Sequence, residues 1–201
     1  MSRLSTCLNK QLVTKSLNIN PIRYPRISSP FASVTTRLYS QTYNGNMSTE
    51  PPRNEMVYLP GVLSPNRSFG VFRKVLHTGL YSQFVAMEVP VNGEIGDEKH
   101  TVDQVLLFTS GVGKAIVAGK EQEVKQGDTV IVPAGTQHQF LNVGSSPLEV
   151  VTIYSPAEHH PQTVHQTKAE GDEKEESGQD EPAEWSQRSK AENERLGLVK
   201  V

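Results

Sequence analysis

The feature that most constrains the fold of this chain is a series of short β-rich runs between residues 55 and 156. These runs, such as VDQVLLFTSG, DTVIVPAG and LEVVTIYSP, are each bounded by Gly, Pro, Asn or Ser. Many short strands separated by such turn residues indicate an all-β sandwich or barrel. We therefore predict one barrel domain over residues 55–167, which is long enough to fold independently.

The first 49 residues have a different composition, with no Asp or Glu and with six Lys and Arg residues among many Ser, Thr and Asn. Such a segment is typical of a mitochondrial transit peptide, and RLYS at residues 37–40 resembles the cleavage site of the matrix protease. We predict that residues 1–49 are a disordered presequence that directs the protein to the mitochondrial matrix. A basic tail without targeting function is the alternative, and Met47 offers the start of a shorter cytosolic form.

Residues 168–201 form a charged tail. The stretch KAEGDEKEESGQDEPAEW has almost no large apolar side chains, so we expect a solvated linker. Residues 182–196 are expected to form a short helix, because Pro182 stands in its first turn, Arg195 in its last turn and Gly197 just beyond its end.

Charge and composition exclude several classes of partner. The net charge of −2 gives no bulk attraction to nucleic acid or to an anionic membrane. No apolar run approaches the roughly 20 residues that span a bilayer, and the single Cys7 excludes an internal disulfide framework. We expect a small-molecule ligand as partner. We also expect a homodimer, in which residues 66–79 pair with a second subunit or cover an open sheet edge.

The motif GDTVIVPAGTQHQFLN, residues 127–142, places one His at the start of an apolar strand. The Pro-Ala-Gly at residues 133–135 is expected to reverse the chain. His138 and Phe140 then share one face of the returning strand, because side chains alternate along a strand. His138 should therefore face the apolar interior, where an imidazole needs a hydrogen-bond partner or a metal ion.

Three possible co-ligands lie upstream of this motif. Glu98 and His100 are two residues apart and are expected on one face of a strand, and Gln104 follows. Two imidazoles, a carboxylate and an amide oxygen make a mixed site that suits Mn, Fe, Ni or Zn. Alternatively, the two imidazoles are core or mouth histidines bonded to neighbours, Glu98 is a surface carboxylate or a general base, and Gln104 binds a substrate.

Residues 127–142 resemble the second motif of the cupin family at each of its fixed positions: Gly127, Pro133, Gly135, His138 and Asn142. The first cupin motif is partly present, with Glu98 in place of one His and Gln104 in place of the usual Glu. The resemblance covers residues 57–170 and is strongest to small mannose-6-phosphate-isomerase-like cupins. It implies a double-stranded β-helix, a jelly-roll barrel. It also implies a divalent metal ion inside the barrel, held by Glu98, His100, Gln104 and His138.

Three functions stay open at this stage. The first is a metal-dependent enzyme with isomerase or dioxygenase chemistry, for which the sequence assigns no catalytic residue. The second is a protein that binds a metal or metabolite without catalysis, and the third is a structural, oligomerising barrel. A second group of histidines, His159, His160 and His165, is expected on a polar segment crossing the barrel surface. The alternative is that one of them reaches the barrel mouth.

Overall fold

The computed structural model describes residues 48–199, so the predicted presequence and Met47 lie outside the described residues. Ten strands dominate this range, which confirms the predicted all-β class. They are β1 (Arg73–Thr78), β2 (Gln83–Val89), β3 (Glu94–Glu98), β4 (Asp103–Ser110), β5 (Val112–Val117), β6 (Lys120–Lys125), β7 (Thr129–Val132), β8 (His138–Asn142), β9 (Leu148–Ser155) and β10 (Val164–His165). Within the described range, no helix is both long enough and apolar enough to span a membrane.

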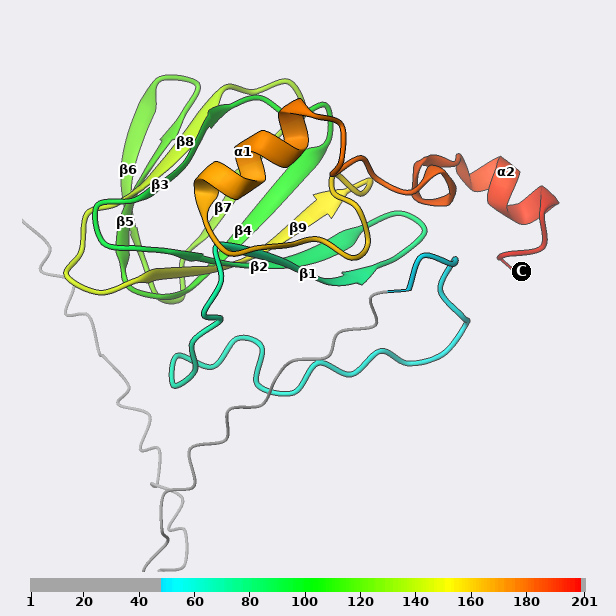
Figure 1. The fold of residues 1–201 in the computed structure, drawn as a ribbon, viewed down its shortest axis with the longest axis horizontal. Helices are drawn as coiled ribbons and strands as arrows, with labels where there is room; N and C mark the ends of the chain where they lie inside the picture. Colours follow the sequence, from blue (N-terminus) through cyan, green and yellow to red (C-terminus); the bar gives the residue numbers. More distant parts are fainter. Residues whose placement is uncertain (1–47, 200–201) are drawn as a thin grey trace, which may run out of the picture. The chain divides into compact units, whose positions relative to one another are not determined.

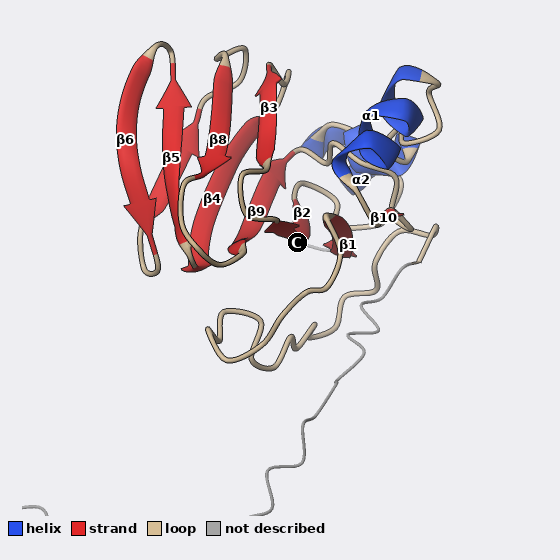
Figure 2. Cartoon of the chain, turned by 60° about the vertical axis from the view of Figure 1, so that its left-hand side comes forward, coloured by secondary structure: helices blue, strands red, loops and turns tan. Residues whose placement is uncertain are grey.

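The strands form two antiparallel sheets, which Figure 1 labels and Figure 2 shows from the side of β5 and β6. One sheet has the order β10-β1-β2-β9-β4-β7, and the other has the order β3-β8-β5-β6. Alternate side chains of both sheets point inward, as the strand period requires. They build a core that includes Ile95, Leu106, Phe108, Phe140 and Val150. The two sheets therefore enclose the space in which His138 was expected.

The segment at residues 66–79 contributes β1, which lies inside the larger sheet. Its outer side pairs with β10 of the same chain, with Arg73 opposite His165 and Lys74 opposite Val164. Strand β1 thus covers the edge of β2, and β10 covers the edge of β1, within the same chain. This agrees with the expectation that residues 66–79 cover an open sheet edge. The homodimer stays a prediction.

The C-terminal segment differs from the expected solvated linker. Residues Lys168–Glu176 form α1, whose N-cap residue Thr167 accepts a hydrogen bond from the Glu170 N–H. Lys168 and Asp172 form an i,i+4 ion pair on its exposed face. The helix packs on the barrel through Gly171, which is buried against Phe72. The charged composition hid this contact because a glycine, rather than an apolar stripe, makes it.

The helix expected over residues 182–196 is divided in two. A 3-10 helix, η1, covers Glu184–Gln187, and α2 covers Lys190–Arg195. The backbone of Arg188 is extended between them. Ser189 then starts α2 with a capping box, in which its side chain and that of Glu192 bond each other's backbone N–H.

Candidate metal centre

The neighbouring strands β3 and β8 bring Glu98 next to His138. Their register is shifted between Gly96 and Glu98, which places Glu98 directly opposite His138. Gly96 has φ +85°, and a Cβ atom at this position would lie only 2.7 Å from the His138 carbonyl oxygen. A glycine is therefore required for the close approach. As a result, Glu98 Oε1 lies 3.6 Å from His138 Nε2.

His100 joins this pair from a loop. Strand β3 ends at Glu98, so His100 does not share a strand face with it as the sequence suggested. The turn of the second motif holds the loop in place instead, because the Gly135 N–H donates to the His100 carbonyl oxygen over 2.7 Å. The His100 Nε2 atom then lies 3.1 Å from Glu98 Oε1. Glu98, His100 and His138 each offer one ligand atom within 4.8 Å of the others'.

Gln104 lies on β4, in the sheet opposite His138, and is fully buried. Its Nε2 donates to the Tyr154 hydroxyl over 3.0 Å. The Tyr154 ring in turn meets the edge of the His100 ring, with centroids 5.5 Å apart. The amide oxygen of Gln104 has no hydrogen-bond partner. Of the two roles the sequence left open, ligation through this oxygen fits that arrangement better than donation to a substrate.

His138 has an orientation suited to a ligand. Its Nδ1 lies 2.9 Å from the Thr136 carbonyl oxygen, which can only accept, so Nδ1 carries the proton. The lone pair is then on Nε2, which is buried without a hydrogen-bond partner. An unpartnered buried acceptor costs about 1–3 kcal/mol. Metal-binding imidazoles are commonly held by a carbonyl group on the second nitrogen in this way. The residues present therefore fit a divalent ion.

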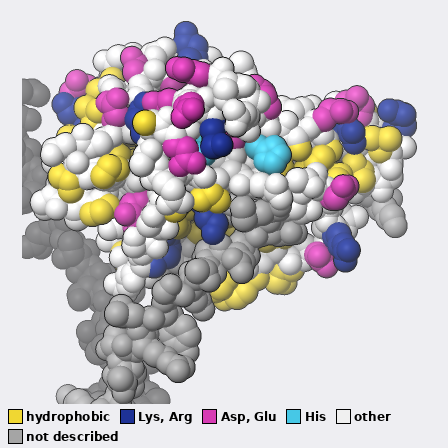
Figure 3. All heavy atoms as spheres, in the orientation of Figure 1, with side chains coloured by type: hydrophobic (Ala, Val, Ile, Leu, Met, Phe, Trp, Pro, Cys, Tyr) yellow, Lys and Arg dark blue, Asp and Glu magenta, His cyan; other side chains and the backbone are white. Residues whose placement is uncertain are grey.

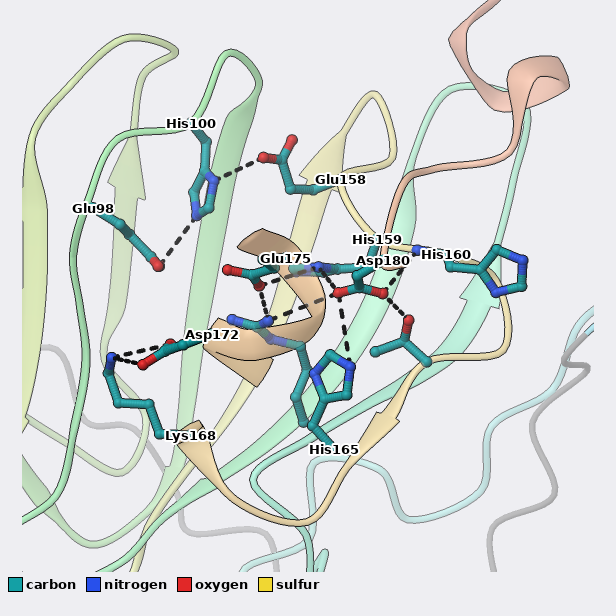
Figure 4. Close-up of polar contacts among 12 residues, drawn as sticks. Glu98, His100, Glu158, His159, His160, His165, Lys168, Asp172, Glu175 and Asp180 are labelled. Carbon is teal, nitrogen blue, oxygen red and sulfur yellow. Dashed lines mark hydrogen bonds and ion pairs between the residues drawn. The ribbon is translucent and has the colours of Figure 1, made fainter. Parts of the chain in front are cut away.

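His100 is held between two carboxylates, as Figure 4 shows. Its Nδ1 lies 2.8 Å from Glu158 Oε1, on the side opposite Glu98. Burial alone would lower the pKa of His100, but hydrogen bonds to Glu158 and Glu98 raise it to about 9. Burial would raise the pKa of Glu98, but the hydrogen bond and the positive charge of His100 hold it well below the usual range. The protonated imidazole thus supplies the positive charge that this carboxylate pair requires.

Glu158 and Tyr154 are the site residues that sequence reasoning missed. A ligating His needs a partner on its second nitrogen, which was a signal that some acceptor should exist. Its identity depends on contacts between residues 58 positions apart, however. No local pattern marks Glu158 within PAEHH as that acceptor.

The second His group is not on the surface as favoured above, because His159 and His165 are both 1% exposed. His159 Nδ1 lies 2.8 Å from Asp180 Oδ2, and Glu175 is close by. These three residues also have the spacing of a metal site. The guanidinium of Arg73, however, pairs with Glu175 and lies 4.0 Å from Asp180. The side chain of Arg73 is the cation of this cluster.

A cavity of about 600 Å³ lies between the two groups. Its lining includes Glu98 and His100 on one side and His159 and Asp180 on the other. His159 therefore contributes to the barrel mouth, as the alternative interpretation expected. A small molecule in this space can contact both groups.

Comparison with known proteins is consistent with this geometry. The sequence profile of the Cupin_2 family, a cupin domain, matches residues 85–154. The chain is 32% identical to the uncharacterized protein L612 of Acanthamoeba polyphaga mimivirus over 111 residues, 52% of this chain and 69% of that protein. The structure is also similar to the crystal structure of BH2720 from Bacillus halodurans, with a TM-score of 0.56 and a sequence identity of 32%. This match covers 61% of this chain and 96% of that chain. The chain belongs to the cupin superfamily.

A further relative is the uncharacterized protein YrkC of Bacillus subtilis. It is 36% identical over 122 residues, which are 55% of this chain and 65% of that protein. The match therefore covers just under two thirds of YrkC. Cupins commonly bind divalent metal ions, and the group of Glu98, His100 and His138 is compatible with one in this chain.

Proposed function

We propose that this cupin binds one divalent metal ion through Glu98, His100, Gln104 and His138 and holds a small molecule against it. The observation that carries the proposal is the pair of buried, unpartnered acceptors, His138 Nε2 and Gln104 Oε1. They come from opposite sheets. His138 lies beside Glu98 and His100, and Gln104 is linked to His100 through Tyr154. Two nitrogen and two oxygen donors suit Mn, Fe, Ni or Zn and leave coordination positions for a ligand.

A metal ion bound here would polarise a carbonyl or hydroxyl oxygen of the ligand as a Lewis acid. The chain's own residues then have distinct roles. Glu158 keeps the His100 ring in a fixed orientation through its bond to Nδ1. The Tyr154 hydroxyl fixes the amide of Gln104 so that its oxygen is free. The 600 Å³ cavity beside Glu98 and His100 receives the ligand. This arrangement suits isomerase-type chemistry, and a redox-active ion would extend it to dioxygenase-type chemistry.

The test is metal analysis of the purified chain. After incubation with Co²⁺ and desalting, inductively coupled plasma mass spectrometry should find about one ion per chain in the wild type. His138→Ala should lose most of it, because the variant lacks the donor on β8. His160→Ala is the matched control, since this partly exposed imidazole lies outside the centre, and it should retain the ion. Equal cobalt in all three proteins would refute the proposal.

A further inference from the structure

The cavity in front of Glu98 and His100 is closed on its other side by the C-terminal part of the chain. Glu158 and His159 come from the loop after β9, Glu175 from the end of α1, and Asp180 and Glu181 from the loop after α1. Figure 4 shows Glu158 and Glu175 between Glu98 and His100 and the cluster of His159 and Asp180. A ligand that reaches the metal centre therefore has this wall at its far end.

The wall has a negative charge. Arg73 lies behind it and supplies one positive charge to two carboxylates, those of Glu175 and Asp180. Glu181 is exposed and makes no hydrogen bond or ion pair with another residue in the range 48–199. Apart from His100, which belongs to the metal centre, the one cationic side chain among the described cavity-lining residues is Lys99, which is exposed. Acidic side chains also gather on the outer face over α1, as Figure 3 shows.

The hydrogen-bonding groups of this wall are acceptors. Glu158 and Glu181 offer carboxylate oxygens. His159 donates from Nδ1 to Asp180, so its Nε2 is an acceptor. This atom is buried without a partner, in a side chain that is 2% exposed. Burial, with the charge of Arg73, lowers the pKa of His159 and keeps the ring neutral. An ammonium group, which has three donors and no acceptor, matches such a wall, whereas a phosphate or carboxylate group does not.

We propose that the ligand of this cavity carries an ammonium group, which faces Glu158, His159 and Glu181, at the end opposite the oxygen atoms that bind the metal. The proposal rests on the metal centre proposed above. It assigns the ligand to amino-bearing hydroxy or carbonyl compounds. Ligands with an anionic distal group, such as sugar phosphates and dicarboxylates, would meet like charge and acceptors without donors.

Three hydroxamic acids that differ only in the tail test this inference. All three chelate a metal ion through the same head. β-Alanine hydroxamic acid ends in an ammonium group, propionohydroxamic acid in a methyl group, and succinic acid monohydroxamate in a carboxylate. Calorimetric titration of the Co²⁺-loaded full chain should give about tenfold tighter binding for the ammonium tail than for the methyl tail. The carboxylate tail should bind about tenfold more weakly than the methyl tail, and about 0.5 M NaCl should reduce both differences.

A pair of variants locates the effect. Glu181→Gln should reduce the preference for the ammonium tail about threefold, because Glu181 lines the cavity. Glu184→Gln removes the same charge from η1, outside the cavity lining, and should leave the preference unchanged. Equal affinities for the three tails, or tightest binding of the carboxylate tail, would overturn the inference while the metal centre stands. Failure of all three compounds to bind would overturn the metal centre, and the inference with it.

Discussion

Two groups of His and carboxylate side chains face one cavity, and they differ in what supplies the positive charge. In the group of Glu98, His100 and His138, the positive charge comes from His100 itself, which is protonated in the absence of a metal ion. The His138 Nε2 atom of this group has no hydrogen-bond partner. In the group of His159, Glu175 and Asp180, the guanidinium of Arg73 is built in. Residue type and spacing alone therefore do not define a metal site. The decisive feature is whether the protein already fills the cationic position.

The pKa shifts of the two groups follow the same division. The pKa of His100 is raised to about 9, despite burial, by the carboxylates on both of its nitrogens. The pKa of His159 is lowered by burial and by Arg73, although Asp180 acts in the opposite direction. One imidazole can therefore exchange its proton for a metal ion, and the other serves as a neutral part of a structural network.

The largest effect that distinguishes the two groups should come from Asp180→Ala. Asp180 is 4% exposed and contacts His159, Thr163 and the backbone N–H of His160. Removing one member of a buried charge network costs about 3–5 kcal/mol, so urea denaturation should show a loss of about 3 kcal/mol. Asp172→Ala, which removes only the exposed pair with Lys168, should change the free energy of unfolding by less than about 0.5 kcal/mol. If Asp180→Ala unfolds with the wild-type midpoint, the conclusion that this group stabilises the fold as a buried charge network is wrong.

Removal of a metal ion by a chelator should lower the stability of the protein only through the group of Glu98, His100 and His138. At about a hundredfold excess of metal ion over its Kd, binding to the folded state stabilises by about 2.7 kcal/mol. Adding EDTA should therefore lower the melting temperature of the wild type but not of the double variant His100→Ala/His138→Ala. The variant His159→Ala should remain sensitive to EDTA, even if its melting temperature is lower. Loss of EDTA sensitivity in His159→Ala alone would place the ion in the second group.

Gln104→Ala should weaken metal binding by about tenfold, a smaller effect than loss of an imidazole. The amide oxygen is neutral and is a weaker donor than a carboxylate, so we expect its loss to cost about 1.4 kcal/mol of binding free energy, which is about tenfold in affinity. Competition with a fluorescent chelator measures the change. Gln104→Glu keeps an oxygen donor at this position and adds a negative charge, so this variant should bind the ion more tightly than the wild type. Unchanged affinity in both variants would show that Gln104 is not a ligand.

The smallest expected effect is a pH dependence of stability in the metal-free chain. The folded-state pKa values of His159 and His165 are lowered, chiefly by burial, from 6.5. Below about pH 6.5 the unfolded chain then binds protons that the folded chain does not, so the free energy of unfolding falls as the pH falls. Urea denaturation between about pH 6 and about pH 5, where His100 is protonated in both the folded and the unfolded chain, should show this fall, and His159→Gln should reduce its size. A fall of equal size in wild type and variant would contradict the assignment of this effect to His159.

The parts of the site that the sequence predicted are those set by local rules. The turn at residues 133–135 and the alternation along β8 fix the inward direction of His138, and both depend on neighbouring residues only. Glu98 lies opposite His138 because of the register shift that Gly96 allows. The alternation of side chains along a strand does not predict such a shift. Glu158 and Tyr154 come from distant parts of the chain. Helix α1 was missed because its packing depends on the absence of a side chain at Gly171.

Crystals of the full chain grown with Co²⁺ and measured at the cobalt absorption edge would show directly which of the two groups holds the ion. We predict one anomalous peak about 2.0–2.2 Å from His138 Nε2 and from one nitrogen of His100, with an oxygen of Glu98 and of Gln104 as further ligands. We expect no peak between His159 and Glu175, where Arg73 remains in place. A peak at that second position, or none beside His138, would refute the proposed metal centre.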